Sequence, residues 1–460
     1  MKIIGLDIGT TSICGIMIDS ESGELLESRT RMNDSNISDT APWEKCQDPL
    51  IILAHCKSIL DDFMQLAGAD SDDIVSIGIT GQMHGIVYLD SAGIPVSPLY
   101  TWQDERGSQP FSESNTYTSY LSRVTGYPMA TGYGLTTHFY LVQNDLVSEK
   151  AAVFCSISDY VAMSLVHTAS PVVHASNAAS FGLFDVEKNT FDANALQEAG
   201  IDSSLLPVVT NKTQILGRMP DGIPVSVAIG DNQASFLGSV CEPDAILVNV
   251  GTGSQVSVRL SGTCAALSGT HAAEGIQIRP FAGGDTLCVG SPLCGGFTYS
   301  VLKGFFAQTA SLLGADYVNL YQKMDAAAQA LYPCAQPLLV DTRFRGTREN
   351  PHLRGRIENI SPANLTPGHL CLGVLKGICD ELYTLYQKMP ADRPRTVLIG
   401  SGNGIRNSPL MQQIFTDTFG IKLQIPRYQE EAAYGAGLFS IYAAGLCHSL
   451  QEAQSKIRYQ

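Results

Sequence analysis

Two stretches decide the fold of this chain, Leu6-Asp7-Ile8-Gly9-Thr10-Thr11-Ser12 and Val248-Asn249-Val250-Gly251-Thr252-Gly253-Ser254. In each, an apolar run that reads as a β-strand leads into a Gly-Thr-x-Ser turn. One offset of 242 residues aligns the two copies. The repeat predicts two similar α/β domains. We expect the boundary near Cys241 to Asp244, giving one domain over residues 1–242 and another over 243–460.

The segments around these copies also favour an α/β fold. Short apolar runs separated by turns cover residues 2–8, 13–18 and 25–30, and their spacing predicts an antiparallel meander. Asp48-Pro49 is a good helix start, because Asp caps the first turn and proline fits the first helical position. Further along we expect strands over 74–79, 225–229 and 396–399, and helices from about 409 and over 430–445.

Length and charge limit the function classes. A chain of 460 residues is expected to form two or three domains. Its net charge of −15 argues against nucleic acid as a partner, since nucleic acid binding needs a basic surface that displaces counterions. An anionic membrane surface is disfavoured for the same reason. The sequence leaves monomer and homodimer open.

Cysteine usage and hydropathy favour the cytoplasm. The cysteines are scattered and form no CxxC pair, which is typical of reduced thiols rather than of a secreted disulfide scaffold. The first residues contain no apolar segment of the signal-peptide kind. The longest uncharged stretch, 160–184, contains Pro171, two histidines and several serines, so it is a poor membrane span.

The first repeated turn is a candidate phosphate site. Gly9 allows a polyanion to approach the backbone, and Thr10, Thr11 and Ser12 add hydroxyl donors. Asp7, at the strand end, could hold Mg²⁺ directly or through water. The structural alternative is a tight hairpin whose hydroxyl groups cap the backbone. The second copy, at 251–253, favours phosphate, because two such turns facing across a cleft could hold a nucleotide tail.

Two further segments lie between a strand and a helix. Gly400 to Gly404 has the order of a binding turn, although it is neither a Walker A loop nor a Rossmann fingerprint. Asp231 follows the run 225–229 and is expected to begin a helix. Its structural role would be an N-cap, and its functional role would be a general base in the interdomain cleft.

Two polar clusters follow predicted strands. The first is Gln82-Met83-His84, and the second is Trp102-Gln103-Asp104. Several donors and acceptors beside an aromatic plane suit a polyhydroxylated ligand, so Gln82 and Trp102 are candidate sugar-binding residues. A lone histidine such as His84 is more often a structural hydrogen-bonding group.

Taken in this order, the motifs resemble those of the FGGY carbohydrate kinases, and the resemblance covers residue 2 to about 445. Within the family the chain is most similar to the sedoheptulokinases, in Thr101–Asp104, Asp159–Met163 and Ser176–Gly182. Xylulokinases share Gln-Met-His, but they usually read Trp-Asn-Asp or Trp-Cys-Asp where this chain has Trp-Gln-Asp.

The resemblance implies an α/β fold of two ribonuclease-H-like, actin-like ATPase domains with the active site in the cleft between them. It implies that Asp231 is the catalytic residue and that Met83, His84 and Asp104 contact the sugar. The implied nucleotide-binding positions are Asp7, Gly9, Thr10 and Thr11 in the first turn, Gly251, Thr252 and Gly253 in the second, Gly295 near the phosphates, and Gly402, Asn403 and Asn407 in the adenosine segment.

The expected activity is transfer of the ATP γ-phosphate, with Mg²⁺, to a hydroxyl of a ketose. Sedoheptulose is the first choice, and D-xylulose or another pentulose is the alternative. Two other classes stay open at this point. A non-kinase actin-like ATPase would share the phosphate turns but would not need the two polar clusters. A catalytically silent sugar sensor should have lost Asp231 or one of the turns.

Overall fold

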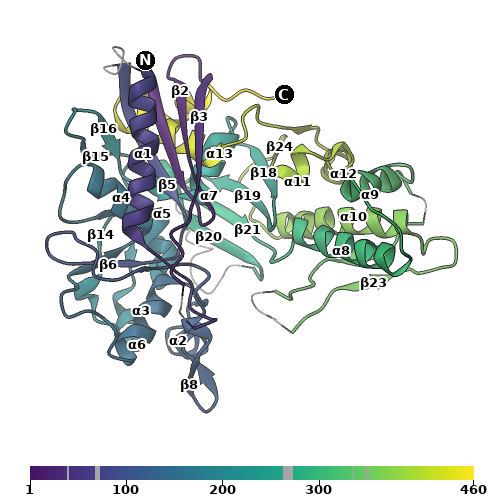
Figure 1. The fold of residues 1–460 in the computed structure, drawn as a ribbon, viewed down its shortest axis with the longest axis horizontal. Coiled ribbons are helices and arrows are strands. Elements are labelled where there is room, and N and C mark those ends of the chain that lie inside the picture. The colour runs from purple at the N-terminus through teal and green to yellow at the C-terminus, as the bar shows by residue number, and fades with distance from the viewer. Residues whose placement is uncertain (39–40, 68–72, 263–272, 335, 348–349, 351) are drawn as a thin grey trace.

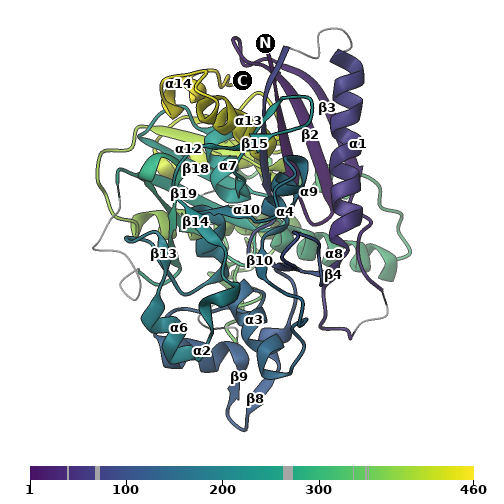
Figure 2. The same ribbon diagram turned by 90° about the vertical axis from the view of Figure 1, so that its left-hand side faces the viewer.

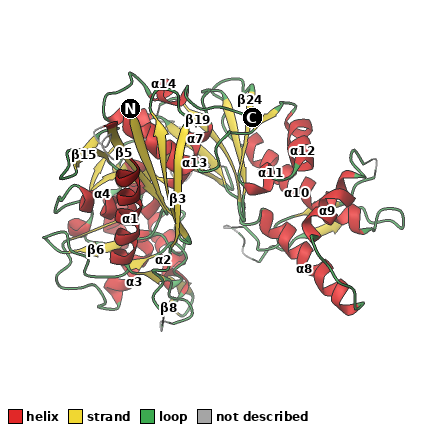
Figure 3. Cartoon of the chain, turned by 45° about the horizontal axis from the view of Figure 1, so that its top comes forward, coloured by secondary structure: helices red, strands yellow, loops and turns green. Residues whose placement is uncertain are grey.

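The computed structural model describes the chain except for residues 39–40, 68–72, 263–272, 335, 348–349 and 351. Two mixed β-sheets organise it. In Figure 1 the first half, purple to blue, forms the left part of the molecule, and the green helices of the second half lie on the right. Figure 3 shows the strands as two groups flanked by helices.

The first sheet has the strand order β15-β16-β5-β1-β2-β3, with β17 also paired to β5. Its strands are β1 (Lys2–Ile8), β2 (Ser12–Asp19), β3 (Leu25–Met32), β5 (Ile74–Gly81), β15 (Ile215–Arg218), β16 (Pro224–Ser226) and β17 (Ile229–Gly230). β1, β2 and β3 form the predicted antiparallel meander, and β1 and β17 run parallel to β5. The single strand expected over 225–229 is divided into β16 and β17.

The second sheet has the order β20-β21-β19-β18-β24-β25. Its strands are β18 (Ala245–Val250), β19 (Ser254–Leu260), β20 (Ile276–Pro280), β21 (Thr286–Gly290), β24 (Val397–Ser401) and β25 (Leu423–Gln424). β18 pairs antiparallel with β19, β19 antiparallel with β21, and β18 parallel with β24. β1 has the same relation to β2 and β5, so the sequence repeat is a structural repeat and the predicted α/β fold is confirmed.

Helices and short strands cover the sheets. The long helices are α1 (Pro49–Ala67), α8 (Gly296–Leu312), α10 (Pro367–Gln387), α12 (Pro409–Phe419) and α13 (Glu431–Ala443). The shorter ones are α2 (Tyr117–Thr125), α3 (Gly134–Gln143), α4 (Ile157–Leu165), α5 (Ala175–Ala178), α6 (Ala193–Ala199), α7 (Asp231–Ser239), α9 (Leu320–Gln329), α11 (Asn403–Arg406) and α14 (Leu450–Gln454). Among the two-stranded pieces are β6 (Val87–Leu89) with β10 (Val153–Cys155) and β11 (Val172–His174) with β14 (Val208–Thr210).

Capping residues set the starts of the long helices. The Asp48 carboxylate accepts a hydrogen bond from the Leu50 backbone N–H at 2.8 Å, before Pro49 opens α1. Ser408 accepts from Met411 N–H at 3.3 Å, and Pro409 is the first residue of α12. These side chains satisfy donors that a helix leaves unpaired in its first turn. Figure 2 shows α1 lying along β2 and β3 of the first sheet.

The last long helix, α13, returns from the second half of the chain and packs against β1, β5 and α7 of the first half. Glycines bring the backbones into direct contact. A Cβ on Gly78 of β5 would lie 1.8 Å from the carbonyl oxygen of Ala436, and one on Gly435 would lie 1.8 Å from that of Ala234 in α7. No side chain fits at these two points. The crossing therefore fixes α7 and the first sheet against each other.

A separate apolar core lies between the two sheets. It includes Ile229 of β17, Leu247 of β18, Ile399 of β24 and Phe439 of α13, each buried to 97% or more. The two halves therefore share buried surface, although the expected boundary at residue 242 falls between α7 and β18 and separates the sheets. In the described ranges, no helix is both long enough and apolar enough to cross a lipid bilayer.

A matched pair of alanine substitutions tests the crossing. Gly435→Ala places a methyl group against backbone, whereas Gly437→Ala meets the movable Ile18 side chain, 3.1 Å away. Both changes gain the same helix propensity, so their difference reports packing alone. Overpacking of this kind costs about 1–3 kcal/mol. We expect Gly435→Ala to lower the free energy of unfolding by about 2 kcal/mol more than Gly437→Ala, measured by urea and thermal unfolding. Equal stabilities would contradict the direct contact.

Candidate active site

Parallel strands of the first sheet end at one edge, and the predicted site residues lie there. The register sets Ile8 of β1 and Gly230 of β17 against Gly81 of β5. Asp7 and Asp231 therefore lie on either side of the end of β5. The carboxyl ends of parallel strands are a usual place for binding sites in α/β proteins. The structure thus brings the candidate base and the candidate metal ligand to one edge.

The first phosphate turn, residues 9–12, joins β1 to β2 and is held from outside by Asn33. The Asn33 side-chain amide donates to the Gly9 carbonyl at 2.9 Å, and its backbone N–H donates to the Thr11 carbonyl at 3.0 Å. Thr11 is exposed, and Gly9, Thr10 and Ser12 are partly exposed. The turn is therefore fixed in shape while its outer surface stays accessible to a ligand.

A hydrogen-bond chain joins this turn to both polar clusters. The Trp102 indole N–H donates to the Thr10 hydroxyl at 2.9 Å, and that hydroxyl donates to the side-chain oxygen of Gln82, Oε1, at 3.2 Å. Gln82 Nε2 donates to Gln47 Oε1 at 2.9 Å, and Gln47 Nε2 donates back to the Thr10 carbonyl at 2.9 Å. Gln82 is 4% exposed, whereas Trp102 is 46% exposed. Trp102 can therefore face a ligand, while Gln82 mainly connects the turn to β5.

The second turn, residues 251–253, is built together with the segment at 294–297. Gly296 N–H donates to the Gly251 carbonyl, and Phe297 N–H donates to the Thr252 carbonyl, both at 2.9 Å. A Cβ on Gly295 would lie 2.5 Å from the Gly253 carbonyl oxygen. The backbone of one turn thus lies directly on the other. Gly295 and Gly296 also begin the 17-residue helix α8, whose N-terminus favours negative charge.

The adenosine segment lies beside the second turn. Asn249, which aligns with Asp7 in the repeat, donates its amide to the Ser401 hydroxyl at 2.8 Å. Gly402 has φ +80°, and a Cβ there would lie 2.6 Å from the Val250 carbonyl oxygen. Asn403 and Asn407, which bracket the short helix α11, are both exposed. The structure therefore joins three glycine segments that are far apart in the sequence.

Buried negative charge gathers at the edge of the first sheet. Burial, together with the charges of Asp231 and Glu430, raises the pKa of the Asp7 carboxyl to about 7. Burial also raises the pKa of Asp231 to about 6, against the lowering effects of Arg279 and of a hydrogen bond from the Asn232 backbone. Such a group of carboxyl groups favours a proton or a bound cation.

A cation at this edge would need ligands from outside the protein. In the part of the chain that the structure describes, no three His, Cys, Asp or Glu side chains are grouped closely enough to hold a metal ion by themselves. Mg²⁺ commonly takes one or two carboxylates and fills its other positions with water and phosphate oxygens. The residues present therefore fit Mg²⁺ bound together with a nucleotide.

The start of α7 is bonded across to the second half of the chain. Arg279 of β20 donates to the Asn232 side chain at 3.0 Å, and Gln233 donates to the Pro280 carbonyl at 3.1 Å. Asp231 thus lies in a segment that is held by both halves. The predicted placement of the candidate base between the two halves agrees with these bonds.

A cavity of about 800 Å³ opens beside this edge. Met83 and His84 line it from the first half, and Gln277 and Arg279 line it from the second. Hydroxyl side chains on its walls include Ser108, Thr116, Thr118, Ser119 and Thr131. Apolar side chains such as Met129, Leu183 and Ile276 form much of the remaining wall. An apolar wall with a few polar groups is usual for a small-molecule site, and the hydroxyl groups could bond to a polyhydroxylated ligand.

His84 is fixed in the wall of this cavity in an uncommon backbone conformation. Its φ is +73°, which side-chain-bearing residues rarely adopt. Its ring stacks on Tyr133, with the ring centres 4.7 Å apart and the planes 2° from parallel. Met83, 5% exposed, packs its sulfur next to Gly230. Met83 thus lies close to the residue that precedes the candidate base, and His84 follows Met83 directly in the chain.

Asp104 has different surroundings from the expected ones. Its carboxylate is fully buried and accepts from the backbone N–H groups of Lys45 at 2.9 Å and Arg106 at 3.1 Å. The Arg106 guanidinium forms an ion pair with it and also pairs with Glu44 at 2.8 Å. The structure gives Asp104 these internal partners instead of an opening toward the cavity. A direct contact with sugar is therefore not supported here.

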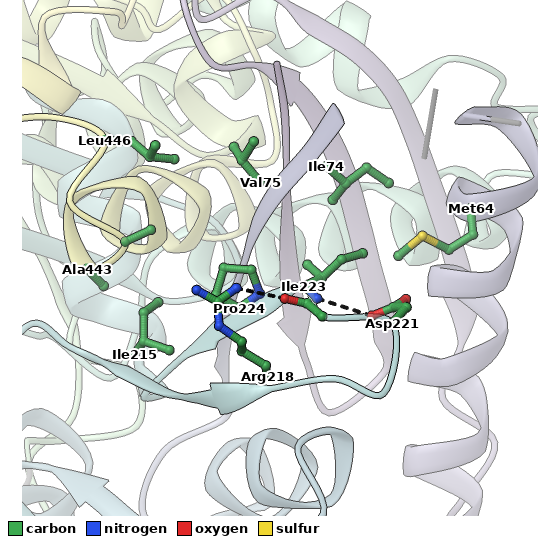
Figure 4. A pocket seen from close by; sticks show the side chains of 12 residues that line it. Met64, Ile74, Val75, Ile215, Arg218, Asp221, Ile223, Pro224, Ala443 and Leu446 are labelled. Atoms are coloured by element: carbon green, nitrogen blue, oxygen red, sulfur yellow. Dashed lines mark hydrogen bonds between the residues drawn. The ribbon is translucent and has the colours of Figure 1, made fainter. Parts of the chain in front are cut away.

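A second cavity, of about 470 Å³, lies away from all these residues (Figure 4). It is lined by Met64 at the end of α1, Ile74 at the start of β5, and Ala443 at the end of α13. Its two charged residues form hydrogen bonds within the turn at 218–223. Arg218 donates to the Gly222 carbonyl at 2.8 Å, and Asp221 accepts from Ile223 N–H at 3.2 Å. It contains none of the chemistry expected of a kinase site.

Sequence reasoning missed four residues that shape the site. Asn33 and Gln47 hold the first turn, and neither belongs to a motif. Glu430 adds negative charge near Asp7. The acidic pair Glu430-Glu431 before a helix was a readable signal for it, since acidic residues favour helix starts. Arg279 lies in an ordinary strand pattern, and only the tertiary structure brings it to Asp231.

Comparisons with known proteins give the family context. The FGGY family of carbohydrate kinases matches through its N-terminal domain over residues 2–238 and through its C-terminal domain over residues 297–444. The sedoheptulokinase of Mus musculus is 26% identical over 473 residues, covering 95% of this chain and 96% of that protein.

Solved structures share the fold. A ligand-bound xylulose kinase from Lactobacillus acidophilus superposes with a TM-score of 0.83 at 19% identity, covering 100% of this chain and 92% of that one. A Plasmodium falciparum glycerol kinase with ADP superposes with a TM-score of 0.79 at 18% identity, covering 99% and 92%. At such identities these two likenesses describe the fold and leave the sugar undetermined.

The raised pKa of Asp7 gives a testable pH dependence. Its folded pKa of about 7 lies above the roughly 3.9 of an unfolded chain. The native state therefore binds the proton more tightly, and this carboxyl lowers the free energy of unfolding as pH rises from about 4 to about 7. In EDTA, the melting temperature of Asp7→Asn minus that of the wild type should be larger at pH 8 than at pH 5. Asp316→Asn, which removes an exposed carboxylate, is the control. A wild-type-to-variant difference independent of pH would contradict the shift.

Proposed function

The chain belongs to the FGGY family of carbohydrate kinases, and from this premise we propose that it transfers the γ-phosphate of ATP to a hydroxyl group of a ketose. One observation carries the proposal. Asp231 and the first phosphate turn lie at the same strand edge, beside a cavity whose wall includes several hydroxyl side chains. Base, phosphate site and sugar site are therefore contiguous.

The nucleotide is proposed to bind against the second half. The turns at 251–253 and 294–297 offer a closely packed backbone surface and the N-terminus of α8, which suits phosphate groups. The exposed amides of Asn403 and Asn407 suit the polar edges of adenosine. The first turn, Gly9 to Ser12, is proposed to receive the γ-phosphate as the two halves close on it.

Mg²⁺ is proposed to bind through Asp7, directly or through water. The raised pKa of Asp7 reflects a site that is short of positive charge. When bound, Mg²⁺ neutralises the charge that the phosphate oxygens carry during transfer. Asn249, the repeat partner of Asp7, is uncharged and bonded to Ser401, so the second turn offers no equivalent carboxylate.

Asp231 is proposed to act as the general base. It accepts the proton of the attacking sugar hydroxyl while the sugar oxygen bonds to the γ-phosphorus and ADP leaves. Its pKa of about 6 keeps most of the carboxylate ionised at pH 7 and makes it a better proton acceptor than an ordinary aspartate. Closure of the two halves would exclude water, which competes as a nucleophile.

The sugar is proposed to lie against Met83, His84 and Trp102. Trp102 presents an exposed aromatic face, and the His84 ring lies in the cavity wall. Gln82 and Asp104 are proposed to act indirectly, Gln82 through Thr10 and Asp104 by fixing the loop that carries Trp102. This indirect role for Asp104 follows from its burial.

Sedoheptulose is the proposed first substrate. The mouse sedoheptulokinase is similar over almost its whole length, and one of the segments that resemble that group, Ser176–Gly182, lines the cavity. D-Xylulose or another pentulose is the alternative. A non-kinase ATPase or a silent sensor is disfavoured, because Asp231, both turns and the cavity with its hydroxyl side chains are all present.

A substrate panel tests the proposed function. With ATP and Mg²⁺, sedoheptulose should give the highest kcat/KM, D-xylulose a lower one, and glycerol a poor one, because a short polyol leaves polar groups of the site unpaired. Discrimination of that kind can reach roughly 10⁴-fold. ADP release and the mass of the sugar phosphate are the readouts. Glycerol as the best substrate would refute the ketose assignment, and ATP turnover that is independent of sugar would favour the ATPase.

Substitution of the base is the second test. Asp231→Asn keeps the size of the side chain but cannot take the proton, so kcat should fall by at least ~10². The dissociation constant of ATP should stay within about two-fold of wild type, because the nucleotide contacts are elsewhere. Asp316→Asn again serves as the control. An unchanged kcat with lowered stability would make Asp231 only a helix-start residue.

A further inference from the structure

One short segment, residues 176–180, bonds both to the residue before the candidate base and to the sugar-side histidine. It consists of α5 and the turn of helix that follows it, Ala179–Phe181. Ser176 and Ser180 are four residues apart, so they lie on the same side of this short helical stretch. They are 1% and 5% exposed, so their hydroxyl groups are directed into the protein.

Ser176 holds the residue that precedes the base. Its hydroxyl oxygen accepts a hydrogen bond from the Gly230 backbone N–H at 3.0 Å. The same hydroxyl pairs with Nδ1 of His174 at 2.8 Å, and Nδ1 also accepts from the Ser176 backbone N–H at 3.2 Å. Because Nδ1 accepts the backbone bond, the Ser176 hydroxyl donates to it. His174 thereby orients the Ser176 hydroxyl, so that a lone pair of its oxygen faces the Gly230 N–H.

His174 stays an acceptor at neutral pH. Burial lowers the pKa of its imidazole to about 4, so the ring is uncharged there and Nδ1 keeps its lone pair. On the other side of Gly230, the Thr80 hydroxyl donates to the Ile229 carbonyl at 2.8 Å. The two residues before Asp231 are thus held from β5 and from α5.

Ser180 holds His84 in the same way. Its hydroxyl oxygen accepts from the His84 backbone N–H at 3.0 Å and donates to the Asn177 carbonyl at 2.7 Å. The Ser180 carbonyl lies 2.7 Å from His84 Nδ1 and can only accept, so Nδ1 carries the proton. These bonds stabilise the left-handed backbone of His84, a conformation that is unfavourable for a residue with a side chain when it is unsupported.

The segment itself is anchored by Asn177, which lies between the two serines. Asn177 is fully buried and donates to the Ser158 hydroxyl at 3.3 Å and to the Asp159 carboxylate at 3.4 Å. Asp159 accepts from the Ser156 hydroxyl at 2.6 Å. The anchor therefore consists of buried groups on α4, away from the cavity. The two serines are attached to a fixed point and not to a loop that moves with the ligand.

We propose that Ser176 and Ser180 are positioning residues of the kinase, Ser176 for Asp231 and Ser180 for His84. The inference rests on the proposed function. Both hydroxyl groups are engaged within the protein, Ser176 with the Gly230 backbone and His174 and Ser180 with the His84 and Asn177 backbones, so neither is a catalytic residue. Because the segment bonds to the residue before the base on one side and to His84 on the other, it sets the distance between the two.

The two serines should have separable effects on catalysis. Ser176→Ala leaves Gly230 N–H without its acceptor, so kcat should fall at least ~10-fold, because small displacements of a catalytic group cost that much or more. Its sugar KM should change less than about three-fold. Ser180→Ala should instead raise the sugar KM about 10-fold and change kcat less than about three-fold. The ATP KM should stay constant in both variants.

Ser226→Ala is the matched control, because Ser226 is also a buried serine of the first half, and its hydroxyl donates to the Val227 carbonyl. If either alanine variant unfolds, Ser176→Cys and Ser180→Cys replace it. Cysteine has nearly the volume of serine, but its sulfur is a much weaker hydrogen-bond acceptor than the hydroxyl oxygen. A purely structural role would lower the melting temperature and leave all constants per folded enzyme unchanged. That result, or the same pattern in both variants, would overturn the proposal.

Crystal structures of the variants separate this inference from the proposed function. In Ser176→Ala, residues 230 and 231 should shift or become disordered while His84 stays in place, and in Ser180→Ala the reverse should hold. An unchanged position of Asp231 in the first variant would refute the inference even if the wild type phosphorylates sugar. If the wild type phosphorylates no sugar, the proposed function is refuted. The positions of Asp231 and His84 in the variant structures would then still decide whether the two serines position them.

Discussion

The geometry of the site depends on one contact, the direct backbone crossing of α13 with α7 and the first sheet. Gly78 and Gly435 leave no space for a side chain at the crossing. α7 begins at Asp231, α13 begins directly after Glu430, and β1 carries Asp7. Because these elements touch at their backbones, the three acidic groups are brought to one place with little freedom to separate. A wider crossing would move the proposed base, Asp231, away from the proposed metal ligand, Asp7.

This arrangement explains why the carboxyl groups are electrostatically unfavourable in isolation. Burial and the charges of Asp231 and Glu430 raise the pKa of Asp7, and burial raises the pKa of Asp231. In the family's chemistry these carboxylates would stabilise a bound cation, and the cation would neutralise the negative charge on the phosphate oxygens during transfer. Arg279, which reaches the site from β20, offsets part of the negative charge on Asp231. The second half of the chain thus contributes to the base as well as to the nucleotide site.

The sequence predicted features that local patterns encode. Strand runs, capped helix starts and the duplicated Gly-Thr-x-Ser turn all depend on neighbouring residues, so the meander and the repeat could be predicted. The return of α13 onto the first sheet could not, because Gly435 and Gly78 are more than 350 residues apart in the chain. The fully buried pairing of Asp104 with Arg106 was missed for a similar reason. A Trp-x-Asp cluster after a strand looks the same whether its carboxylate faces a ligand or the protein interior.

The crossing also has a consequence for synthesis on the ribosome. Glu431, the first residue of α13, follows Ile8, the last residue of β1, by 423 residues. At roughly 5–20 residues per second, β1 waits some 20–80 s for the helix that covers it. During that time the nascent first sheet exposes apolar strands and a strip of bare glycine backbone to its surroundings. The amino-terminal half therefore reaches its final packing only when the end of the chain has been made, and its yield in cells should depend on chaperones that occupy that face in the meantime.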